Sequence, residues 1–168
     1  MSADQISPVL SAGCELALVK KDPNSIGLCR KESAAVDSNR SHSAMESLSA
    51  HDELGLALME SGQDAGAATA EFNRAIDLAS GTLSSADEEW GELFWHRAAA
   101  EQKSGQPGEA NQDFAVAEKS LKQAADKLSR GSNGYRTLLV QVINQHAALL
   151  ESEGKHEDSQ ALLKEVDQ

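Results

Sequence analysis

Two cysteines are the first residues of this chain whose chemistry could define a site. Cys14 and Cys29 lie on either side of the segment Asp22-Pro23-Asn24. If antiparallel helices flank that segment, the two side chains lie at a similar height and a disulfide can join them. Such a bond would stabilise the hairpin by about 3 kcal/mol. The alternative is a pair of reduced, buried cysteines that pack as small hydrophobes.

The other reactive residue types lack the spacing of a known site. The five histidines, His42, His51, His96, His146 and His156, include no HExxH pair. We therefore expect each to be a surface or partly packed histidine. The chain has no GxGxxG, no phosphate-binding loop and no GxSxG elbow. The sequence predicts no catalytic residue, no metal and no cofactor.

The charge of the chain restricts its partners. Its 168 residues include 27 acidic and 15 basic side chains, for a net charge of −12. Phosphate backbones and anionic lipids would repel it, so we expect no nucleic-acid partner. No apolar run approaches the roughly 20 residues of a membrane span. The start, MSADQISPVLSAG, lacks the features of a signal peptide, which leaves a soluble cytoplasmic protein or a leader-cleaved extracytoplasmic one.

The composition and the positions of residues that begin and end helices predict an all-α chain. Aromatic residues make up only 4%, whereas strands are rich in them. Prolines 8, 23 and 107 fit helix starts, Ser85 to Glu88 fits a capping box, and Gly62, Gly105 and Gly154 fit helix ends. Apolar stripes run from Ala110 to Leu128 and from Tyr135 to Leu150. We expect about eight helices, near 6–20, 24–37, 42–61, 64–80, 86–104, 107–130, 135–153 and 156–167.

The three glycine turns carry a repeat. A small residue stands seven positions before each glycine, and a small–large–small series follows. These residues are Gly55, Ala98 and Ala147 before the turns, and Ala68-Phe72-Ala75, Ala110-Phe114-Ala117 and Ser159-Leu163-Val166 after them. Small residues let two helices approach closely, and the large one fills the space toward the next hairpin.

This pattern resembles the tetratricopeptide repeat (TPR) family, most closely in WHRAAAEQKSGQPGEANQDFAVAE at 95–118. The glycines at 62, 105 and 154 are 43 and 49 residues apart, against a usual period of about 34. The chain therefore looks more like long-helix members such as the kinesin light chain type. The resemblance implies one domain over 1–168, in which antiparallel helical hairpins stack as a short right-handed α-solenoid. Its repeat hairpins are 42–80, 86–130 and 135–167. The segment 6–37 is a degenerate or capping hairpin, with Gly13 at the small position and Lys20 at the turn.

The resemblance also implies a concave groove lined by the first helix of each hairpin. The matching residues are Asp52, Leu56, Met59, Glu92, Trp95, Ala99, Lys103, Asn144, Ala148 and Glu151. An apolar centre with an acidic rim suits a basic or apolar peptide. Asp52 and Trp95 occupy positions of the family's chaperone-tail clamp, so we expect no such clamp. Alternatively, Leu56 and Met59 belong to the core. Of Trp90 and Trp95, we expect one to be core and Trp95 to be an exposed anchor.

The sequence thus predicts a non-enzymatic adaptor or scaffold that docks a peptide or partner domain. One alternative is a self-associating structural building block, because the final helix offers Leu162, Leu163 and Val166. A small-ligand binder or an enzyme is the third reading, since such sites form in three dimensions and escape a linear scan.

Overall fold

The structure, a computed structural model, describes residues 3–38, 42–62, 64–127 and 133–166. Side chains are described over the same ranges except at 3–8, 127 and 133–135. The predicted stripe member Leu128 therefore lies outside the described residues, and the side chain of Tyr135 is outside the described ones.

Eight helices and no strand occupy the described part of the chain, which confirms the all-α prediction. They are α1 (Ala3–Val19), α2 (Ser25–Ser38), α3 (Ala44–Ser61), α4 (Ala65–Ala79), α5 (Glu88–Lys103), α6 (Pro107–Lys127), α7 (Asn133–Ser152) and α8 (His156–Leu163). Most boundaries lie within three residues of the predicted ones. The last helix is shorter than predicted, because 164–166 form a turn.

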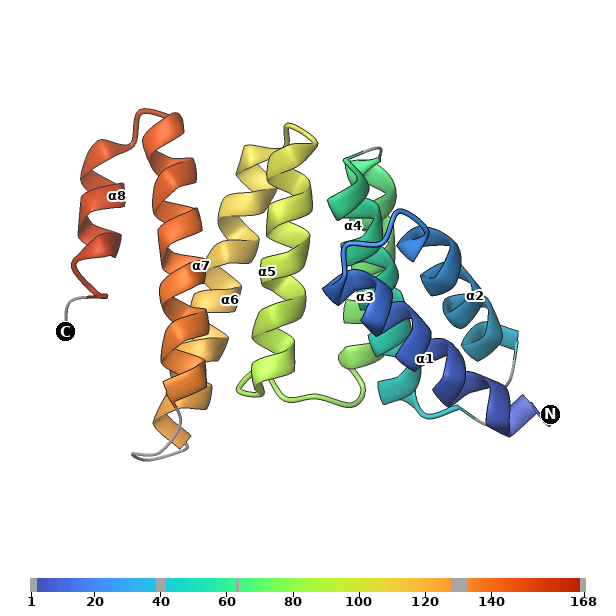
Figure 1. Cartoon of the computed structure of the whole chain (residues 1–168). Coiled ribbons are helices and arrows are strands. Elements are labelled where there is room, and N and C mark those ends of the chain that lie inside the picture. The colour runs from blue at the N-terminus through green and yellow to red at the C-terminus, as the bar shows by residue number, and fades with distance from the viewer. Residues whose placement is uncertain (1–2, 39–41, 63, 128–132, 167–168) are drawn as a thin grey trace. The chain divides into compact units, whose positions relative to one another are not determined.

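The helices form two compact units, residues 1–82 and 83–168. In unit 1, α1 packs on α2, α2 on α3 and α3 on α4, and α1 also contacts α3. In unit 2, α5 packs on α6, α6 on α7 and α7 on α8, and α5 also contacts α7. Each unit is thus a pair of helical hairpins whose first helices touch (Figure 1). The prediction of one domain over 1–168 stays a prediction.

Left-handed residues end the first helix of every hairpin. Gly62, Gly105 and Gly154 have φ of 67°, 77° and 77°, as predicted, and Lys21 has φ of 52°. The amide of Asp22 donates to the carbonyl of Ala17, as that of Gln106 does to Glu101 in the second unit. Such a bond marks the Schellman ending of a helix.

The turn of the first hairpin corrects its predicted register by one residue. Lys21, and not Lys20, takes the place of the turn glycine. The small position seven residues earlier is therefore Cys14, and not Gly13. Cys14 is fully buried, whereas Gly13 is only half-buried.

The prediction of a capping box at Ser85 to Glu88 is wrong. The capping box lies at Ser43 and Glu46, where the Glu46 amide donates to Ser43 Oγ and the Ser43 amide to Glu46 Oε2. Ser85 is not the N-cap of α5, because this helix begins after Asp87. The Asp87 carboxylate accepts a hydrogen bond from the Ser84 amide. Pro107 is the first residue of α6, as predicted.

The other two prolines are not at helix starts. Pro8 lies within α1, and Pro23 lies in the turn two residues before α2.

The cores match the predicted repeat at 68–75 and 110–117, whereas in the last hairpin Ser159 is buried but Leu163, the predicted large core residue, is 40% exposed. Phe72 and Phe114 are completely buried, each beside a small residue of the preceding helix. A Cβ built on Gly55 would lie only 2.5 Å from the Phe72 ring. The unit 2 core consists of Ala98, Ala110, Phe114, Ala117, Leu121, Val142 and Leu149, with Phe94, Trp95, Leu138 and Leu139 packed against it. The predicted stripes therefore face the core over the described residues.

Candidate functional site

The first helices of the two unit 2 hairpins carry the predicted surface residues. On α5, Glu92, Trp95 and Ala99 are half-buried and Lys103 is exposed. On α7, three further predicted residues, Asn144, Ala148 and Glu151, are exposed. Spacings of three and four place each set on one face of its helix. Because α5 contacts α7, the two sets belong to neighbouring helices, and we call them the α5–α7 face.

Trp95 joins the two halves of this face. Its indole Nε1 donates a hydrogen bond of 2.8 Å to Gln145 Oε1 on α7. Its ring also packs against the unit 2 core and leaves part of its surface accessible. The indole is therefore held in one orientation, with an apolar side and a satisfied polar atom.

The expectation that one tryptophan is core is wrong, because both are half-buried. Trp90 lies one turn before Phe94, with ring centroids 5.1 Å apart. Neither indole is enclosed in the way Phe114 is.

The predicted residues of unit 1 lie on one face of α3. Asp52, Leu56 and Met59 are all half-buried, so Leu56 and Met59 are not among the buried core residues. The predicted groove takes residues from both units, and its continuity stays a prediction.

Cys14 and Cys29 form a disulfide in the structure, with Cα atoms 4.8 Å apart. Both are fully buried between α1 and α2. In the corrected register, Cys14 occupies the small position and Cys29 the position of the large residue. The disulfide thus stands where Gly55 meets Phe72 in the second hairpin.

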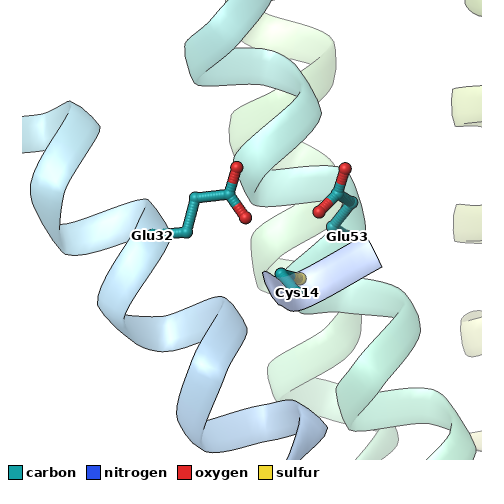
Figure 2. A group of neighbouring side chains, drawn as sticks. All are labelled: Cys14, Glu32 and Glu53. Atoms are coloured by element: carbon teal, nitrogen blue, oxygen red, sulfur yellow. The ribbon is translucent and has the colours of Figure 1, made fainter. Parts of the chain in front are cut away.

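Two buried carboxyl groups lie beside this disulfide. Glu32 on α2 and Glu53 on α3 point toward one another next to Cys14 of α1 (Figure 2). One carboxylate oxygen of each and the Cys14 sulfur all lie within 4.8 Å of one another. The Oε2 atoms of both glutamates are buried without a hydrogen-bond partner among the described residues.

Burial and mutual repulsion favour the neutral form of this pair. Desolvation, followed by the charge of Glu32, raises the pKa of Glu53 to about 8. Burial also raises the pKa of Glu32, although a hydrogen bond from Ser11 works against it. When no cation is bound, at least one of the two carboxyls is therefore protonated at neutral pH.

A second buried acid lies in unit 2. The Arg97 guanidinium donates to both oxygens of Asp113, at 2.5 and 2.8 Å. Glu101 lies next to this pair, with one oxygen 3.8 Å from Arg97 and Oε2 buried without a hydrogen-bond partner in the described part of the chain. Burial, and then the charge of Asp113, raises the pKa of Glu101 to about 7. The guanidinium of Arg97 is much closer to Asp113 than to Glu101, so its charge offsets the burial of Glu101 only in part.

Two of the histidines correct the expectation of surface or partly packed residues. His51 is buried, with Nδ1 2.8 Å from Glu71 Oε2 and Nε2 3.2 Å from Asp37 Oδ1. His146 is buried as well, with Nδ1 2.7 Å from Glu118 Oε1, and its ring stacks on Phe114. Each imidazole ties helices together through a carboxylate.

Sequence reasoning missed these buried polar groups, although the helical period contained a signal for them. Glu32 falls three residues after Cys29 and four before Val36, on the buried stripe of α2. His51 lies between Leu48 and Leu54 on the stripe of α3 in the same way. A charged or imidazole side chain on an apolar stripe marks a buried site, but its partner comes from another helix.

Comparison with known proteins identifies the fold. No family model and no curated protein sequence matches the chain. Among solved structures, it is similar to a crystal structure from Podosopora anserina, of a kinesin light chain type protein with nearly identical TPR-like repeats. The TM-score is 0.61 at 16% identity, over 99% of this chain and 95% of that one.

The chain has a TPR-like repeat fold. The similar structure is of a kinesin light chain, the type that the spacing of the glycine turns indicated. Within the TPR-like fold, the α5–α7 face is built from the first helices of two successive hairpins. No helix of the described residues is long and apolar enough to cross a membrane.

Proposed function

We propose that the chain is a non-enzymatic protein-interaction module that holds a peptide or partner segment on the first helices of its hairpins. The fold supports this proposal, because TPR-like repeats offer helix faces rather than enclosed pockets. Two pockets of the described residues are of 240 Å³, beside the Lys21–Ser25 turn, and of 370 Å³, at the Gly154–Asp158 turn. The first is below the roughly 300–1,000 Å³ of ordinary small-molecule sites, and the second is lined by a single polar turn rather than by the apolar walls typical of such sites.

The α5–α7 face is the observation that carries the proposal. It combines the half-buried indole of Trp95, hydrogen-bonded to Gln145, with exposed polar and small residues of a second helix. Tryptophan in such a setting is typical of binding hot spots. Glu92 and Glu151, on a chain of net charge −12, favour a partner segment with basic and apolar side chains.

Charge reversal tests this proposal without touching the core. The double variant Glu92→Lys/Glu151→Lys changes the face, whereas Trp95→Ala would also remove packing from the unit 2 core. Asp77→Lys/Asp126→Lys is the matched control. It changes the charge by the same amount, at exposed positions near the C-terminal ends of α4 and α6, where a cation is tolerated.

Affinity capture from the source cell, read by quantitative mass spectrometry, compares the three proteins. We expect wild type and the control to capture the same partners. The α5–α7 variant should capture at least tenfold less of each of them. A partner retained equally by all three proteins, each with wild-type circular dichroism, would place binding elsewhere and reject this face.

Self-association is a second candidate, favoured by exposed apolar residues. On α1, Val9, Leu16 and Val19 are 61%, 52% and 77% exposed, and they fall on one face of the helix. Leu163 on α8 is 40% exposed. If the chain self-associates, its molar mass in light scattering should rise with protein concentration. At the same concentration the molar mass of Leu16→Glu should be lower than that of wild type. A constant monomeric mass would exclude this candidate.

A further inference from the structure

Three helices of unit 1 bring potential metal ligands to one buried point. Cys14 comes from α1, Glu32 from α2 and Glu53 from α3 (Figure 2). Glu32 is only 3% exposed, and its Oε2 has no hydrogen-bond partner among the described residues. A buried carboxylate oxygen that lacks a hydrogen-bond partner costs free energy, and a bound cation would remove that cost.

The set becomes a strong donor set only when the disulfide opens. In the disulfide, the Cys14 sulfur is neutral and a weak ligand. As a thiolate, it joins two carboxylates in a combination that suits Zn²⁺, which binds cysteine sulfur and glutamate oxygen. Calcium and magnesium need six or more oxygen ligands, which this cluster does not offer.

We propose that reduction of the Cys14–Cys29 disulfide turns this cluster into a Zn²⁺ site, with Cys14, Glu32 and Glu53 as protein ligands. Three protein ligands leave the fourth tetrahedral position to water. This proposal concerns unit 1 and is independent of the α5–α7 face.

The chemistry balances with a dithiol as reductant. The dithiol supplies two electrons and two protons, the Cys14–Cys29 bond breaks, and the reductant leaves as a cyclic disulfide. Zn²⁺ then displaces the Cys14 thiol proton and any proton held by the two carboxyls, all of which go to solvent. The ion's two positive charges offset two of the three negative charges that the Glu32 and Glu53 carboxylates and the Cys14 thiolate carry. Glu15 and Asp52 add negative charge near Glu53.

Zinc binding to the full chain in both redox states tests the proposal. The oxidised chain, and the chain reduced with a phosphine, each compete with a chromophoric chelator for Zn²⁺. We expect one Zn²⁺ per reduced chain, bound at least tenfold more tightly than by the oxidised chain. With Co²⁺ as the probe, the reduced chain should show a thiolate-to-metal charge-transfer band that Cys14→Ser lacks.

Matched variants separate the ligands from the bulk charge. Glu32→Gln and Glu53→Gln should each weaken zinc binding at least tenfold, whereas Glu60→Gln, exposed on α3, should not. Cys29→Ser cannot form the disulfide, so it should bind zinc without a reductant. This variant also tests the site if the reduced wild type is unstable.

Three outcomes would overturn the proposal. The first is equal zinc affinity in the two redox states. The second is unchanged affinity in both glutamine variants. The third is a loss of helical circular dichroism on reduction that zinc does not restore, in wild type and in Cys29→Ser alike.

Discussion

Gly55 shows how a single missing methyl group fixes a hairpin. Glycine inside a helix normally costs about 1 kcal/mol relative to alanine. Here the Phe72 ring fills the space that a Cβ would need. Gly55→Ala should therefore destabilise the protein by about 1–3 kcal/mol through overpacking. Urea denaturation followed by circular dichroism measures the change.

Gly27 supplies the matched control for Gly55. It lies within α2, is exposed, and has nothing within 4 Å of a built Cβ. Gly27→Ala should gain about 0.5–1 kcal/mol from helix propensity. If the two alanines have the same effect, the close approach of Phe72 to α3 is wrong.

Lys21 carries local strain that glycine would remove. Its φ of 52° lies in the left-handed region, which costs a side-chain-bearing residue about 1–2 kcal/mol. Part of the gain from glycine is lost to the greater freedom of the unfolded chain, so Lys21→Gly should stabilise by about 0.5–1 kcal/mol. Thermal unfolding of this variant, beside Lys20→Gly, measures it. If Lys20→Gly raises the free energy of unfolding more than Lys21→Gly does, Lys20 is the left-handed residue of the turn, as the sequence predicted, and the corrected register is wrong.

Glu101 should make stability depend on pH. Its folded pKa of about 7 lies above the ordinary value of 4.5. The group therefore contributes its full stability below about pH 4.5, and that contribution is lost as pH rises through 7. Relative to Glu101→Gln, the wild type should lose at most about 3 kcal/mol between pH 5 and pH 8. Parallel denaturation curves at both pH values measure the difference.

The exposed Glu89 on the same helix is the control for Glu101. Glu89→Gln should follow the wild-type pH profile. If Glu101→Gln follows it too, Glu101 is ionised without cost, and its burial beside Asp113 has no effect on stability.

At the scale of elements, the disulfide replaces side-chain packing in the first hairpin. Where the second hairpin has Gly55 against Phe72, the first has Cys14 bonded to Cys29. Replacing both cysteines by alanine should cost about 2–4 kcal/mol. In this double variant the backbone amides of α1 and α2 should lose protection against hydrogen exchange, whereas the amides of α7 and α8 should keep theirs. Unchanged protection in α1 and α2 would mean that the pair is reduced in the protein.

The helices could be predicted from sequence because their limits are set locally. A glycine with a left-handed backbone ends the helix just before it, and the proline at 107 is the first residue of its helix. The start of α5 could not be predicted from a pattern, because Asp87 and Ser84 bond to each other instead of forming the expected box.

The partners of the buried acids could not be predicted, because they lie far away in the chain. Glu32 meets Glu53 only after α2 packs on α3.

At the scale of the whole molecule, the two proposed sites lie in different units of one TPR-like fold. In unit 2, neighbouring first helices offer a partly apolar, acidic face to a partner. In unit 1, the disulfide and the carboxyl pair make the first hairpin sensitive to redox state and to zinc. Each proposal has its own variants, so failure of one leaves the other intact.

Site-specific photo-crosslinking tests the interaction module most directly. A photoreactive residue replaces Ala148 on the α5–α7 face in one protein, and Ala161 on α8 in another. Both alanines are exposed, so both probes reach solvent. We predict adducts with another protein from position 148 and none from position 161. Adducts from position 161 alone, or adducts only with a second copy of this chain, would contradict the proposed function.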